Sequence, residues 1–159
     1  MTSIAEAVRG LAGMRLVEIR RIVDMVVAVF RPDAGVEHTI HAPCPVRVMH
    51  GNVILIGSYD THHPRVPGTD SDESFEKFTT MFDVRAKSLT SSLAEGDYRV
   101  IVAEVGPGGL LAVEAANGSD SIRLEAIPMS SGPQVESWRL FALEKDAEHF
   151  VFPEAAGRD

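Results

Sequence analysis

The sequence predicts a mainly β, α+β domain. We expect two similar antiparallel β-meanders packed as a sandwich or a partly open barrel, with a short N-terminal helix and one central helix. Short runs rich in Val, Ile and Leu recur along the chain, and turn signals separate them. Only two segments space their apolar residues as a helix does. The length, 159 residues, fits a single domain.

The N-terminal helix is predicted by a capping signal. Ser3 and Glu6 stand three residues apart, as in a capping box. Ile4, Val8 and Leu11 then share one helical face. We therefore expect a short helix over residues 4–11.

The middle of the chain combines a loop and a second helix. Residues 62–74 are rich in Pro, Gly, Ser and Asp, which predicts a mobile polar loop. After it, apolar residues at helical spacing predict a helix over 73–88. These residues are Phe75, Phe78, Met81 and Phe82.

The rest of the chain is predicted to be β-structure. Asn117-Gly118 suits the positive φ angles of a tight hairpin, and Gly106-Pro107-Gly108-Gly109 suits another turn rather than a phosphate loop. Trp138 lies on a strand with two apolar faces, which favours a core position. Strands are expected near residues 14–22, 25–31, 36–42, 46–49, 53–59, 98–105, 110–115, 122–126, 135–143 and 149–152.

The two halves of the chain follow a similar pattern. In residues 4–61 and again in 73–152, a helix precedes a hairpin, a shorter strand that ends near proline, and further strands. This similarity predicts an internal pseudo-repeat. Two meanders with one apolar face each would cover one another. The alternative is that two β-meanders of this length resemble each other by chance.

Composition and charge limit the classes of function. The net charge of −8 arises entirely from residues 64–159, which carry nine basic and seventeen acidic residues. An acidic surface disfavours nucleic-acid binding. The apolar runs are too short to span a membrane, and no secretory signal is visible. The single cysteine, Cys44, suits a reducing compartment, so a cytoplasmic location is expected.

The second half carries a pattern that resembles a known family. The pattern comprises Val100–Val105, Gly109–Val113, Asn117-Gly118, Ile122–Pro128 and Glu136-Ser137-Trp138-Arg139-Leu140. It resembles a family of small actinobacterial β-rich proteins of unknown function with a G-x-L-x-V … E-x-W-x-L C-terminal half. The resemblance covers residues 75–152 well and 11–60 loosely. It implies a stand-alone cytoplasmic protein, in some relatives immunity-like, and it supplies no catalytic residue.

Histidines are the first candidates for a functional site. Five of the six lie in residues 38–63. Asp60, His62 and His63 offer a carboxylate and imidazoles, which are zinc or iron ligands. His38 and His41, three apart on a predicted strand, point to opposite faces and so do not share one metal. No second ligand motif accompanies the 60–63 group, so surface histidines are the competing interpretation.

Carboxylates are the second candidates. Glu104, Glu114, Glu125 and Glu136 recur about once per predicted strand. On a shared face they would form an acidic patch for a basic protein partner, whereas the competing interpretation is a solvated outer face. The sequence therefore favours a non-catalytic binding protein without a cofactor, such as an immunity-type protein or a complex subunit that binds a protein or itself. The alternative is a metal-dependent enzyme or small-ligand carrier that uses the region of Asp60, His62 and His63.

Overall fold

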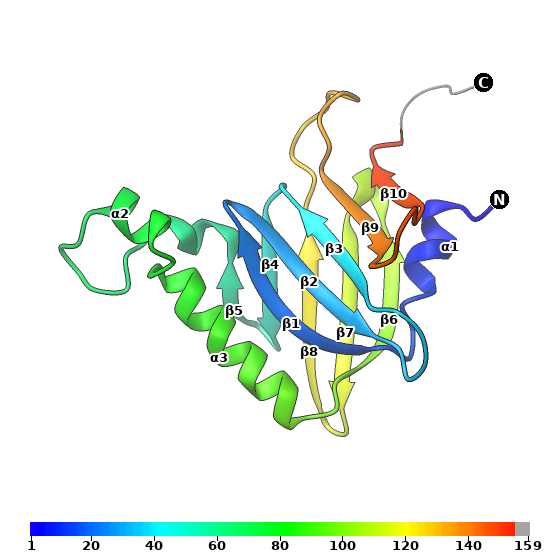
Figure 1. The fold of residues 1–159 in the computed structure, drawn as a ribbon, viewed down its shortest axis with the longest axis horizontal. Helices are drawn as coiled ribbons and strands as arrows, with labels where there is room; N and C mark the ends of the chain where they lie inside the picture. Colours follow the sequence, from blue (N-terminus) through cyan, green and yellow to red (C-terminus); the bar gives the residue numbers. More distant parts are fainter. Residues whose placement is uncertain (155–159) are drawn as a thin grey trace.

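The computed structural model describes residues 1–154 and shows the mainly β, α+β fold (Figure 1). Ten antiparallel strands form one sheet that does not close, in the order β10-β9-β3-β2-β1-β6-β7-β8-β4-β5. The strands are β1 (Arg15–Ile22), β2 (Met25–Arg31), β3 (His38–Ala42), β4 (Val46–His50), β5 (Val53–Gly57), β6 (Arg99–Val105), β7 (Leu111–Asn117), β8 (Asp120–Ala126), β9 (Trp138–Ala142) and β10 (His149–Phe152).

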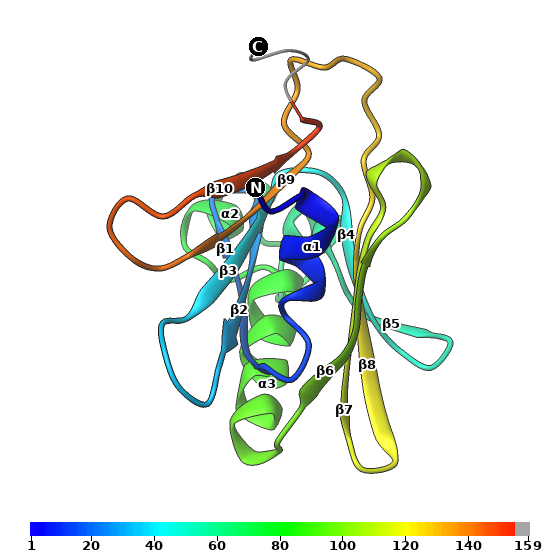
Figure 2. The ribbon, with the colours of Figure 1, turned by 90° about the vertical axis from the view of Figure 1, so that its right-hand side faces the viewer.

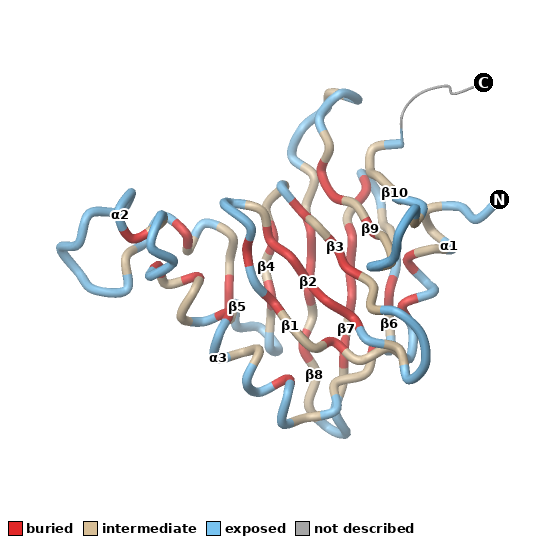
Figure 3. The backbone as a smooth tube through the Cα atoms, in the orientation of Figure 1, coloured by how far each residue is buried: buried red, intermediate tan, exposed pale blue. Residues whose placement is uncertain are grey.

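The sheet bends sharply at its centre, so that its two halves face each other as layers (Figure 2). At the bend, β1 and β6 share one pair of opposed residues, Arg15 and Arg99. The layer β10-β9-β3-β2-β1 and the layer β6-β7-β8-β4-β5 enclose one core. Burial is concentrated on the strands, and all five residues from Val26 to Phe30 of β2 are buried (Figure 3). Trp138 is fully buried there, and its indole N–H donates to the carbonyl oxygen of Gly109 at 2.8 Å.

The strand order has an internal two-fold symmetry. If each strand of β1–β5 is exchanged with the strand five places later in the chain, the order of strands in the sheet stays the same but runs in the opposite direction. The last hairpin of each half pairs with a strand of the other half. In the β4–β5 hairpin, β4 pairs with β8, and in the β9–β10 hairpin, β9 pairs with β3. Both first strands also carry a bulge at matching places, Val17 in β1 and Ile101 in β6. The symmetry fits the predicted pseudo-repeat, whose origin by duplication stays a prediction.

Helices fill the two sides where the layers separate. α1 (Ile4–Arg9) packs on β6 and β10, and the capping box of Ser3 and Glu6 is formed as predicted. α3 (Met81–Glu95) packs on β1 and β5 on the opposite side. The two helices thus occupy symmetry-related positions, but α1 has six residues and α3 has fifteen.

The prediction of one helix over residues 73–88 was wrong in its limits. The chain forms α2 (Ser71–Glu76) and then α3, and Phe78 between them has a φ of +55°. This left-handed residue ends the first helix. Thr80 then starts α3 with a capping box to Asp83.

Two neighbouring segments also differ from the prediction. The first turn of α2 lies inside the predicted loop 62–74, because Asp70 caps the helix by accepting a hydrogen bond from the amide of Glu73. The predicted strand 53–59 ends at Gly57, where the short 3-10 helix η1 (Ser58–His62) begins. A second 3-10 turn, η2 (Pro107–Gly109), connects β6 to β7.

The turn at Gly109 yields a test of the packing between the layers. Gly109 has a φ of +78°, and a Cβ there would lie 2.0 Å from the ring of Phe152. We expect Gly109→Ala to lower the free energy of unfolding by about 2–5 kcal/mol, from backbone strain and overpacking. Gly108→Ala is the matched control, because Gly108 has a φ of +67° and open space around it. It should cost about 1–2 kcal/mol. The free energies of unfolding are measured in urea. Equal decreases for Gly109→Ala and Gly108→Ala would show that Phe152 does not constrain this turn.

Candidate functional site

Three of the four predicted glutamates lie on one face of the sheet, where Glu104 is exposed, Glu114 is half-buried and Glu125 is buried. Glu104, Glu114 and Glu125 lie on β6, β7 and β8. Alternation along the strands places them opposite to the core residues, on the outer face of this layer. Glu104 and Glu125 flank Ala112 from its two neighbouring strands. Glu136 precedes β9 and belongs to the other layer.

The charges on this outer face are unequally paired. Glu125 accepts a hydrogen bond from Arg47 at 2.7 Å and also lies 3.5 Å from Arg123. Glu114 lies 3.8 Å from Arg123. Glu104 is exposed, and within residues 1–154 no basic group pairs with it. Glu104 is therefore the carboxylate of this face that is free to meet an external cation.

Glu136 instead belongs to a cluster of rings and charges on the outer face of β3, β9 and β10. Arg139 donates two hydrogen bonds to its carboxylate, which hold the pKa of Glu136 below its usual range. Phe141 contacts His41 edge-on and stacks on His149, with ring centroids 4.9 and 4.2 Å apart. Burial, followed by the nearby arginines, lowers the pKa of His41 and favours its neutral form. The cluster is internally satisfied.

The predicted metal residues lie at η1 and just after it. The Asp60 carboxylate accepts hydrogen bonds from the amide of Gly57 at 2.9 Å and from Arg85 at 3.1 Å. His62 and His63 are exposed. In the described part of the chain, no three His, Cys, Asp or Glu side chains are grouped as metal ligands. Metal binding by Asp60, His62 and His63 therefore stays a prediction.

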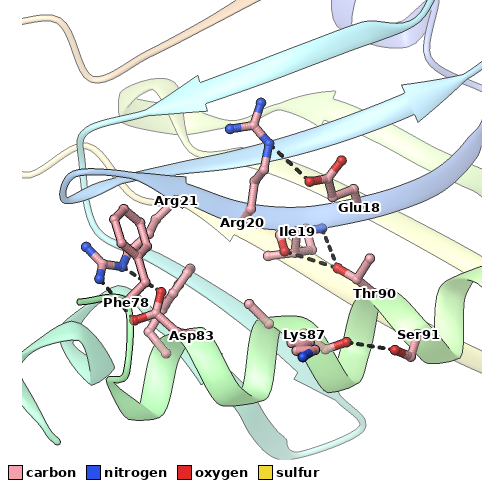
Figure 4. Close-up of a pocket in the computed structure, with 11 residues that line it drawn as sticks. Glu18, Ile19, Arg20, Arg21, Phe78, Asp83, Lys87, Thr90 and Ser91 are labelled. Carbon is pink, nitrogen blue, oxygen red and sulfur yellow. Dashed lines mark hydrogen bonds and ion pairs between the residues drawn. The ribbon is translucent and has the colours of Figure 1, made fainter. Parts of the chain in front are cut away.

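A groove of about 410 Å³ lies between β1 and α3 (Figure 4). One end of it is closed by Arg21, whose side chain is 1% exposed and donates to both oxygens of Asp83 at 2.7 and 3.0 Å. The guanidinium also lies 4.4 Å from the ring centre of Phe75 and 4.0 Å from that of Phe78. These contacts tie the start of α3 and the α2–α3 connection to β1.

The middle of this groove is closed by a hydroxyl group. The amide of Ile19 donates to Thr90 Oγ1 at 3.1 Å, and the same hydroxyl donates to the carbonyl oxygen of Ile19 at 3.1 Å (Figure 4). Both backbone groups lie on the edge of β1 that none of the described strands covers. The side chain of Thr90 thus occupies hydrogen-bonding positions that a neighbouring strand would otherwise use.

The symmetry-related groove lies between α1 and β6, and its volume is about 530 Å³. Ala5, Arg9 and Ala12 line one side, and residues 101–105 of β6 line the other. Neither alanine can cap a backbone group as Thr90 does on β1, and no residue of the range 1–154 brings a hydroxyl into this groove. In Figure 2, α1 and β6 stand next to each other at this open side.

The backbone of β6 presents hydrogen-bonding groups to that groove. The amide of Gly106 donates to Leu110 across the start of the β6–β7 hairpin at 2.8 Å. Because hydrogen-bonding positions alternate along an antiparallel strand, the amides and carbonyls of Ala103 and Val105 point to the opposite edge. Within residues 1–154, no hydrogen bond occupies these positions. The edge of β6 is therefore open where the equivalent edge of β1 is closed.

Sequence reasoning missed Arg21, Asp83 and Thr90. Arg21 lies in a run of strand-forming residues, and nothing local shows that it turns toward α3. A readable signal existed for Asp83, because Thr80 precedes it by three residues as in a capping box. Cys44 is half-buried, and burial raises the pKa of its thiol to about 11, which leaves the sulfur a poor nucleophile.

No protein-family model, curated protein or solved structure matches this chain. The family resemblance noted in the sequence therefore stays a prediction. None of the helices in residues 1–154 is long and apolar enough to cross a membrane.

The ion pair of Arg21 and Asp83 gives a pH-dependent prediction. Burial acts to raise the pKa of Asp83, but hydrogen bonds from Arg21 and Thr80 outweigh it and hold the pKa below its usual value. The contribution of this ion pair to the free energy of unfolding should be fully present above about pH 4, the pKa of Asp in the unfolded chain. It should be lost as the pH falls through the lower pKa that Asp83 has in the folded protein. We expect Asp83→Asn to cost about 3 kcal/mol at pH 6, because it leaves a buried arginine unpaired.

The measurement is urea unfolding of both proteins between pH 2 and pH 7. The difference in free energy of unfolding between wild type and Asp83→Asn should become smaller as the pH falls. Glu148→Gln is the control, because Glu148 is exposed and lies outside this contact. A difference that stays constant with pH would refute the role given to the Asp83 carboxylate.

Proposed function

We propose that this chain is a non-catalytic binding protein whose acidic outer face, defined by Glu104, Glu114 and Glu125, meets a basic partner protein. The observation that carries the proposal is the position of these carboxylates on three adjacent strands of one layer. Figure 2 places α1 and α3 on the opposite side of β6, β7 and β8, toward the other layer. No described helix covers the acidic outer face.

Charge supports a partner that is itself a protein. The whole net charge of −8 comes from residues 64–159, which include all three glutamates of this face. Arg47 and Arg123 neutralise part of the face but leave Glu104 unpaired among the described residues. Such a field favours encounter with a basic surface and opposes a phosphate backbone. An immunity-type protein or a complex subunit would use the face in this way.

The test compares capture of proteins from a lysate of the source organism by three forms of the chain. The first is wild type, the second is Glu104→Lys with Glu114→Lys, and the third is Glu76→Lys with Glu148→Lys. The third form changes the net charge equally, but its exposed positions lie on α2 and in the β9–β10 connection.

Basic proteins retained by wild type and by the third form should be lost by the second. Their retention by wild type should weaken as the ionic strength rises from about 0.05 to 0.3 M, because screening shortens the range of the interaction. Retention of the same proteins by all three forms would contradict the proposed function.

A further inference from the structure

The two symmetry-related edges of the sheet differ in one respect. On β1, the hydroxyl of Thr90 bonds to the amide and the carbonyl of Ile19. By the two-fold symmetry of the strand order, Ala103 of β6 corresponds to Ile19, since both lie two residues after the bulge. Beside Ala103, the described wall of the groove opposite β6 has the small side chains of Ala5 in α1 and Ala12 after it, in place of a capping hydroxyl.

We propose that the open edge of β6 binds an extended segment of a partner protein as an added strand, in which apolar residues alternate with lysine or arginine. The inference rests on the proposed function, because it specifies how a basic partner would be held. Strand addition uses main-chain hydrogen bonds for affinity and alternate side chains for specificity.

The backbone of β6 sets the length of this segment. The amides and carbonyls of Ala103 and Val105 point to the open edge, at the two-residue spacing of a strand. The bulge at Ile101 interrupts the edge on one side, and η2 follows Val105 on the other. The edge therefore accommodates a short segment, of about four to six residues, rather than a long strand.

The inward side chains of the added strand would enter the groove. On β6, Ala103 belongs to the core and Val105 packs against it, so their side chains define the inner side. Ala5 and Ala12 of the opposite wall are small, and the groove measures about 530 Å³. This space suits apolar side chains of moderate size, such as valine. Arg9, at the end of α1, also lines the groove and is exposed to solvent.

The outward side chains of the added strand would adjoin Glu104. This residue lies between Ala103 and Val105 and points to the outer face, where no described basic group pairs with it. Opposite charges on neighbouring strands stabilise their pairing, and like charges destabilise it. A lysine or arginine at the outward positions would therefore complement the edge.

The same charge argues against a second copy of this chain as the occupant. If two β6 edges paired antiparallel about Ala103, Glu104 of each copy would lie diagonally across from its equivalent. If they paired about Glu104, the two carboxylates would be directly opposed. Both arrangements bring like charges together, whereas a basic strand does not.

The experiment uses the full chain and two synthetic peptides of eight residues, one alternating Lys with Val and the other alternating Glu with Val. Binding is followed by NMR through amide shifts and amide hydrogen exchange at Ala103 and Val105. The same measurements are made on Glu104→Lys and on the matched control Glu76→Lys, whose changed residue lies on α2, far from β6 (Figure 1).

We expect the lysine peptide to protect the amides of Ala103 and Val105 and to bind wild type about two- to tenfold more tightly than the glutamate peptide. Glu104→Lys should reverse this preference, and Glu76→Lys should leave it unchanged. If neither peptide affects the two amides, the edge of β6 is not a strand-addition site, even if the acidic outer face still captures a basic protein. Equal binding of both peptides to wild type and Glu104→Lys would overturn the predicted chemistry of the segment.

Discussion

The exchange of hairpins between the two halves is the constraint on which the rest of the structure depends. The hairpin of β4 and β5 completes the layer that begins with β6, and the hairpin of β9 and β10 completes the layer that begins with β1. Residues from both layers share one core, so neither half can bury its apolar face without the other. The chain therefore folds as one interlocked unit, with the bend at Arg15 and Arg99 as the contact between β1 and β6.

This arrangement leaves two strand edges beside helices rather than beside strands. Where the layers separate, α3 covers the edge of β1 and α1 lies beside the edge of β6. α3 is long enough to place Thr90 against Ile19, while Asp83 at its start holds Arg21. α1 ends after six residues. The two edges differ because the hydroxyl of Thr90 bonds to the backbone of β1, whereas Ala5 and Ala12 beside β6 have no hydroxyl.

Much of the fold could be predicted from the sequence. Residue alternation and turn signals located the hairpins on either side of Val23 and Asn117, and the core position of Trp138 followed from its two-sided apolar strand. The break at Phe78 could not be predicted, because the ring of Phe78 packs on the distant Arg21, 4.0 Å from the ring centre, and no local signal marks its left-handed backbone. Apolar spacing runs through this break and therefore indicated one helix.

The candidate site was predictable only in part. Strand alternation could place Glu104, Glu114 and Glu125 on outer faces, but which strands are neighbours depends on the exchange of hairpins, and Glu136 consequently lies in the other layer. The sequence contains no signal for the open edge of β6. That feature depends on alanines standing where a hydroxyl could cap the backbone, and it becomes visible only by comparison with Thr90 on the symmetry-related edge.

Amide hydrogen exchange of the free protein distinguishes a closed β1 edge from an open β6 edge. We expect the Ile19 amide to exchange nearly as slowly as global unfolding allows, and we expect Thr90→Val to accelerate its exchange. The amides of Ala103 and Val105 should exchange much faster, although both residues lie in a well-packed strand. If Ala103 and Val105 were protected as strongly as Ile19, the β6 edge would already be closed and could not accept an added strand.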